Sequence, residues 1–216
     1  MQLIEALVLR SAEPDAARWF DGHIAVKDVS TTRFRAAFAG AGRRLGASAP
    51  QLQAAEAAQL QKAGIAAPAQ WTLPMFARAA FLLRALHALP SGEHVEFVRE
   101  VYRRGDFLEQ AALLQTLMLT PDPARFVNIA VESCRTNVRD VFEAIACENR
   151  YPAAYFADAN FNQMVIKAFF TGVAVDRVVG LEQRKSNELR RMAADYASER
   201  RAAGRTVPND LDLVLS

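Results

Sequence analysis

Helical periodicity is the feature that most restricts what this chain can fold into. Apolar residues recur three or four positions apart along most of its length, and no run alternates apolar and polar residues as a half-buried strand would. The C-terminal region shows the pattern well, because one helix face there carries only apolar and aromatic side chains: Leu189, Met192, Ala193, Tyr196 and Ala203. We therefore predict an all-α protein.

Prolines, glycines and capping residues divide the pattern into separate helices. We expect them at residues 1–10, 15–26, 32–45, 50–63, 73–89, 93–104, 107–119, 124–134, 138–147, 160–171 and 187–203. From residue 73 onward, successive helices pair, and the pairs begin roughly 30–35 residues apart, which is the spacing of helix-pair solenoids. The pattern favours an irregular α-α superhelix of antiparallel helix pairs, similar to HEAT or armadillo stacking. A compact helical bundle is the alternative.

Length favours one domain. The 216 residues can form one substantial core, so we assign residues 1–216 to a single all-α domain. Within it, residues 1–70 form less characteristic N-terminal helices, and residues 71–208 form a core of helical hairpins. Hydrophobic residues make up 51% and charged residues 23% of the chain, as in ordinary globular proteins.

Charge and cysteine usage restrict the partners and the compartment. The net charge is +2, and acidic residues interrupt the basic region 177–205, so we expect no nucleic-acid partner. No apolar run is long enough to span a membrane, and the N-terminus resembles a first helix rather than a signal peptide. Two cysteines without metal-like spacing indicate a bacterial cytoplasmic protein with reduced thiols, no metal and no cofactor. A homodimer is possible.

Three motifs that could indicate chemistry are weak. Gly40–Gly46 is glycine-rich, but a helical pattern precedes it instead of the strand that a nucleotide-binding loop requires. His87 and His94 flank a turn and could hold zinc, yet no motif fixes their geometry. Cys147 ends a helix, where a thiolate is disfavoured, so we interpret it as a packed residue rather than a nucleophile.

The segment Glu148–Thr171 is the strongest candidate for a site. It mixes amides and charges with tyrosines and phenylalanines, and buried polar groups are costly unless they are paired. On a helix, Asn160, Gln163 and Lys167 lie within a narrow polar sector. One interpretation places these three residues with Arg150 and Tyr155 in the lining of a pocket for an oxygen-rich or anionic small molecule.

The alternative interpretation of this segment is structural. Lys167 can be an ordinary solvated residue, and the aromatic residues can be core. Asn162 lies on the apolar side of the same helix, where we expect it to satisfy backbone groups of a loop such as the Tyr151-Pro152 elbow.

The same region resembles a known family. The runs DVFEAIACENRYPAAYFADANFNQMVIKAFFTGV and DRVVGLEQRKSNELRRMAADYASERRAAGRTVP are similar to the EboA family, and the upstream run RGDFLEQAALLQTLMLTPDPARF is consistent with it. The resemblance is strongest from about residue 135 to residue 208. It implies a protein encoded in bacterial gene clusters linked to making or exporting a secondary metabolite. It assigns no catalytic residue.

Two functional hypotheses follow. The first is a non-catalytic helical scaffold or small-molecule-binding protein, whose partners are a metabolite or other proteins of the same gene cluster. The second is a small all-α enzyme that acts on that metabolite and uses Lys167, Tyr155 or Glu148 as acid–base groups, which must then converge in one cleft.

Overall fold

The chain is helical throughout the part that the structure describes. This structure is a computed structural model that describes residues 1–24 and 31–216. It contains fourteen α-helices and no strand within those residues, so the predicted all-α class is confirmed. No described helix combines the length and the apolar character needed to cross a membrane. The predicted end of the second helix, Val26, lies outside the described residues.

The described residues form two compact units, Met1–Phe126 and Val127–Ser216. The assignment of residues 1–216 to a single domain stays a prediction, and so does the superhelical stacking of helix pairs. The first unit contains seven α-helices: α1 (Gln2–Ser11), α2 (Pro14–Ile24), α3 (Thr31–Leu45), α4 (Ala54–Ala63), α5 (Leu73–Ala88), α6 (His94–Arg104) and α7 (Phe107–Thr116). Short 3₁₀ helices at Pro68–Gln70, Ser91–Glu93, Leu117–Leu119 and Pro123–Phe126 connect or extend them.

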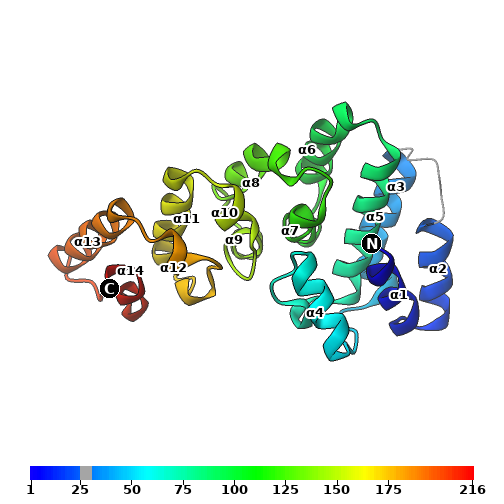
Figure 1. The fold of residues 1–216 in the computed structure, drawn as a ribbon, viewed down its shortest axis with the longest axis horizontal. Coiled ribbons are helices and arrows are strands. Elements are labelled where there is room, and N and C mark those ends of the chain that lie inside the picture. The colour runs from blue at the N-terminus through cyan, green and yellow to red at the C-terminus, as the bar shows by residue number, and fades with distance from the viewer. Residues whose placement is uncertain (25–30) are drawn as a thin grey trace. The chain divides into compact units, whose positions relative to one another are not determined.

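Helix α5 is the centre of the first unit (Figure 1). It buries 12 of its 16 residues, and α1, α2, α3 and α7 pack around it. Alanine and leucine dominate its sequence and favour a helix, and Pro74 is tolerated because it lies in the first turn. A helix that is apolar on nearly every side is stable only when it is surrounded. The composition of α5 therefore requires that other helices cover it.

The second unit is built from shorter helices. Its α-helices are α8 (Val127–Ser133), α9 (Arg139–Ala146), α10 (Tyr151–Tyr155), α11 (Asp158–Thr171), α12 (Leu181–Arg184), α13 (Asn187–Ala202) and α14 (Asp212–Leu215). Two 3₁₀ helices, Val175–Arg177 and Asn209–Leu211, complete it. Helix α11 packs against α9 and α13 and ends at Gly172, whose φ of 67° gives the left-handed C-cap typical of glycine.

Several helix boundaries differ from the sequence prediction, and two of the departures have a clear physical reason. The helix expected at residues 50–63 begins at Ala54, because Gln53 forms a capping box with Glu56 and thus fixes its first turn. The Tyr151-Pro152 elbow is itself the short helix α10, with proline in its first turn.

Candidate functional site

Only some of the five predicted site residues line a common cavity beside α11. Arg150 and Tyr155 do not line this cavity: Arg150 is exposed, and the Tyr155 ring packs 4.9 Å from the Tyr151 ring. The cavity measures about 150 Å³, which is below the roughly 300–1,000 Å³ typical of ligand pockets. Three of the five predicted residues line it, together with residues from α8 and the turn after it, from the C-cap of α10 and from α11. The lining is Val131, Cys134, Arg135, Phe156, Asn160, Gln163, Met164 and Lys167.

The Lys167 amine is held by backbone carbonyls. Its Nζ donates to the carbonyl oxygens of Cys134 at 2.6 Å and Thr136 at 2.5 Å, and it lies 4.9 Å from the centre of the Phe142 ring. These carbonyls follow the last residue of α8, where acceptors lack partners within the helix and a cation is favoured. Lys167 is therefore neither a solvated surface lysine nor a free amine. The ligand-binding role of the five predicted residues stays a prediction.

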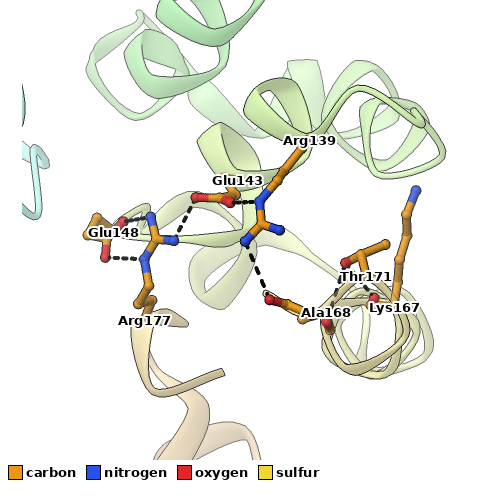
Figure 2. A network of polar contacts seen from close by, with 8 residues as sticks. Arg139, Glu143, Glu148, Lys167, Ala168, Thr171 and Arg177 are labelled. Atoms are coloured by element: carbon orange, nitrogen blue, oxygen red, sulfur yellow. Dashed lines mark hydrogen bonds and ion pairs between the residues drawn. The ribbon is translucent and has the colours of Figure 1, made fainter. Parts of the chain in front are cut away.

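The second functional hypothesis required Lys167, Tyr155 and Glu148 in one cleft, and the described cavities do not bring them together. Glu148 is engaged elsewhere, because the Arg177 guanidinium donates Nε and Nη2 to its two carboxylate oxygens at 2.9 Å each. Figure 2 shows Arg177 between Glu148 and Glu143, whereas the Lys167 side chain extends from a separate helix. Neither Glu148 nor Tyr155 lines the cavity that contains Lys167.

Arg177 is part of a network of charged groups that links separate segments of the second unit (Figure 2). Its Nη1 donates to Glu143 at 2.6 Å, and Arg139 donates to the other carboxylate oxygen of Glu143, also at 2.6 Å. Burial alone would raise the pKa of Glu143, but the hydrogen bonds from the two arginines outweigh it and lower that pKa. The network connects α9 to the turn before α10 and to the 3₁₀ helix Val175–Arg177.

The sequence suggested that Asn162 binds the backbone of the elbow, but Asn149 makes that contact instead. Asn162 is buried as expected, but its Nδ2 donates to Ser186 Oγ at 3.3 Å rather than to the elbow, and its Oδ1 has no partner among the described residues. Asn149 satisfies the elbow instead, because its Oδ1 accepts from the Tyr151 N–H and its Nδ2 donates to the Ala144 carbonyl.

The cysteine, histidine and glycine candidates from the sequence have contacts that fit a structural role. Burial raises the pKa of Cys147 to about 12, so its thiol is protonated at neutral pH. His87 and His94 each hydrogen-bond a nearby backbone carbonyl, and no group of three metal-ligating side chains occurs in residues 1–24 and 31–216. Gly40 lies inside α3, so only Gly46, with φ of 68°, follows the end of that helix.

The first unit contains a larger pocket that the sequence did not reveal. It lies where α2, α3 and α5 meet, has a volume of about 340 Å³, and has an apolar floor with cationic groups at its edge. Arg84 lies at this edge and donates Nε and Nη2 to Glu5 at 2.7 Å each. The described lining is Gly22, His23, Ile24, Arg33, Phe34, Ala36, Ala37, Phe81, Arg84 and Ala85.

One signal in the sequence could have located this region. The run LPMFARAAFLLRALHA is apolar except for Arg78, Arg84 and His87, and an arginine in such a helix must reach a partner or a polar space. The positions of the other two helices, however, depend on tertiary packing.

Comparison with known proteins agrees with the resemblance and extends it. The family model described as metabolite traffic protein EboA matches residues 1–215, including the first 70 residues, which carried little recognisable similarity by themselves. No curated protein and no solved structure matches the chain. Because the family model covers essentially the whole length, the chain belongs to the EboA family of metabolite traffic proteins.

Proposed function

We propose that this chain binds a small metabolite without transforming it, and that the pocket between α2, α3 and α5 holds the metabolite. The observation that carries this proposal is the pocket itself. Its volume of about 340 Å³ falls in the range of small-molecule sites, and buried Phe34, Phe81 and Ala85 supply an apolar floor. The family description, which refers to metabolite traffic, supports binding of this kind.

The edge of the pocket indicates which polar group the metabolite would carry. A guanidinium has five N–H donors, and the Glu5 carboxylate accepts from Nε and Nη2 of Arg84. The remaining donors can hydrogen-bond an oxygen of the ligand. We therefore expect a mainly apolar molecule with an oxygen-containing group at one end.

The dispersed acid–base residues support a non-catalytic role. A general acid or base must reach its substrate within hydrogen-bonding distance. Lys167 is bound to two carbonyls, Glu148 is paired with Arg177, and Tyr155 packs on Tyr151. These three residues are therefore poor candidates for catalysis on a shared substrate.

A pair of substitutions at one position tests the pocket. Gly22 lines the pocket, and among residues 1–24 and 31–216 no atom outside its own stretch of helix lies within 4 Å of the place that an added Cβ would take. We expect Gly22→Phe to fill the pocket and Gly22→Ala to leave it open. Both changes replace glycine within α2, so they share the gain in helix propensity.

The measurement is native mass spectrometry of protein purified from its source cells, together with fluorescence titration with 1-anilinonaphthalene-8-sulfonate, an apolar molecule with one anionic group. We expect the wild type and Gly22→Ala to retain a copurifying small molecule and bind the dye, and Gly22→Phe to lose both. Equal retention by Gly22→Phe, or no bound molecule and no dye binding in the wild type, would contradict the proposal.

A further inference from the structure

A second cleft lies along another face of α3, within the first unit. It has a volume of about 460 Å³ and combines an apolar wall with charged groups of both signs. The apolar wall comes mainly from α3, and the charges come from α3, the end of α6 and the start of α7. The lining residues most relevant to its chemistry are Phe34, Arg35, Phe38, Val101, Asp106 and Glu109.

Glu109 is a half-buried carboxylate that contacts no cation within the described residues. Its own N–H donates to Asp106 Oδ1 at 2.8 Å, and its carboxylate accepts a hydrogen bond from the Asp106 backbone, so the two residues form a capping box at the start of α7. No lysine or arginine of the described residues lies within ion-pair distance of it. Burial raises its pKa, the Asp106 charge adds to that shift, and Arg78 and Arg35 oppose it from a distance.

Arg35 provides the opposite charge in the same cleft. It is half-buried on α3, lines the cleft, and has no hydrogen-bond or ion-pair partner within the part of the chain that the structure describes. Arg104, which also lines the cleft, differs from it because it is paired with Glu100. The cleft thus presents the Arg35 guanidinium and the carboxylates of Asp106 and Glu109, and Arg35 acts on Glu109 through space without an ion pair between them in the described residues.

Arg78 adds a buried positive charge behind the apolar wall. Its side chain is 4% exposed, its Nε donates to the Phe38 carbonyl at 3.0 Å, and its guanidinium carbon lies 5.8 Å from the Phe38 ring centre. Its terminal nitrogens have no hydrogen-bond partner among the described residues, and burial lowers its pKa. A buried arginine without a contacting carboxylate is costly for folding, and the charges of Glu109 and Asp106 in the adjoining cleft partly offset the effect of burial on its pKa.

We propose that this cleft binds a free α-amino acid with an apolar side chain, with its carboxylate at Arg35 and its ammonium group at Glu109. A zwitterion can contact both charged groups at once, and charge-assisted hydrogen bonds of this kind are stronger than neutral ones. Phe34, Phe38 and Val101 then contact the apolar side chain. This cleft shares Phe34 and Ala36 with the pocket between α2, α3 and α5, but its charged groups Arg35 and Glu109 do not line that pocket. The proposal goes beyond the function proposed above.

Matched ligands test the charge pattern. Calorimetric titration of the full chain would compare L-phenylalanine with N-acetyl-L-phenylalanine, which lacks the ammonium group, and with L-phenylalanine amide, which lacks the carboxylate. We expect the amino acid to bind at least about tenfold more tightly than either analogue, since each analogue leaves one charge of the cleft unpaired.

Matched variants assign each charge to its residue. Glu109→Gln should weaken binding of L-phenylalanine while leaving N-acetyl-L-phenylalanine unaffected, and Arg35→Gln should do the same for the amide. Arg103→Gln, an exposed change on α6 outside the cleft, should change nothing, and circular dichroism would verify folding of each variant.

The proposal is overturned if the three ligands bind equally, if L-phenylalanine and L-leucine both fail to bind at millimolar concentration, or if Arg103→Gln weakens binding as much as the cleft variants do. Gly22→Phe separates this site from the first pocket, because it should retain amino-acid binding whether or not it retains the metabolite.

Discussion

The two compact units of the chain use their partly or fully buried charged side chains in different ways. In the second unit, Lys167 and Arg184 are bound to backbone carbonyls, and Arg177 is bound to two carboxylates. In the first unit, Arg78 and Glu109 are at least half-buried yet have no ion-pair partner among the described residues. The charges of the second unit therefore stabilise the fold, whereas those beside α3 remain available to a ligand.

Helix length explains this difference. Each helix leaves about four carbonyls at its C-terminus without partners in the helix. The second unit contains several helices of four to eight residues, including α10 with five and α12 with four, so much of its backbone consists of helix ends. The first unit is built around α3 and α5, with 15 and 16 residues, which satisfy most of their own carbonyls. Long arginine and lysine side chains are needed as caps in the second unit and are not needed around α5.

Removing a capping arginine from the second unit should have the largest effect on stability. Arg184 donates to the carbonyls of Ala153 at 2.6 Å and Phe156 at 2.7 Å, and its guanidinium stacks 4.8 Å from the Phe161 ring centre. We expect Arg184→Ala to lower the free energy of unfolding by about 3 kcal/mol, because the carbonyls at the end of α10 lose their donor. Urea denaturation followed by circular dichroism measures the change.

Arg191→Ala is the matched control for Arg184→Ala. Arg191 makes only exposed ion pairs with Glu188 and Asp195 on its own helix, and such pairs contribute little. If Arg191→Ala destabilised the protein as much as Arg184→Ala, the backbone contacts of Arg184 would not be the source of its effect, and the contrast between the units would fail.

The sequence predicted the class of the fold better than the roles of its polar residues. Periodicity and capping signals depend on neighbouring residues, so most of the longer helices and the burial of Asn162 could be predicted, whereas the short helices α10, α12 and α14 were not. The partners of Lys167 could not, because its amine binds Cys134 and Thr136, more than 30 positions earlier in the chain. The polar and aromatic mixture of Glu148–Thr171 serves to cap many helix ends. A binding site can have the same mixture of residues, so the sequence alone does not distinguish the two.

Arg78, in the apolar run of α5, indicated a site less clearly in the sequence than the segment Glu148–Thr171 did. Arg78 was recognisable as a charge among buried residues, but its relation to a cleft depends on where α3 and α7 pack. Side chains from helices that are distant in sequence create the cleft, so no local pattern encodes it.

Replacing the buried arginine of the first unit should have the opposite sign from Arg184→Ala. Arg78→Met keeps most of the side-chain volume and removes a buried charge whose hydrogen bonding within the described residues is limited to the Phe38 carbonyl. We expect the free energy of unfolding to stay unchanged or rise by about 1 kcal/mol, since apolar replacements of buried charges are often neutral or stabilising. The same urea denaturation measures it. A loss close to that of Arg184→Ala would show that Arg78 stabilises the fold and would remove the difference between the units.

The smallest expected effect concerns the carboxylate of the cleft and depends on pH. The pKa of Glu109 is raised in the folded state, chiefly by burial, so ionisation of this group costs stability as pH rises above the pKa of the unfolded chain. Glu109→Gln removes that cost, because glutamine does not ionise. We therefore expect the variant to be slightly more stable than the wild type at pH 7 and the difference to shrink as pH falls below about 4.5, where the wild-type carboxyl is protonated in both states. Thermal unfolding at pH 7 and at pH 3.5 would measure both differences. A variant that is less stable than the wild type at pH 7 would show that the capping hydrogen bond of Glu109 outweighs its burial, and the carboxylate would then belong with the structural charges of the second unit.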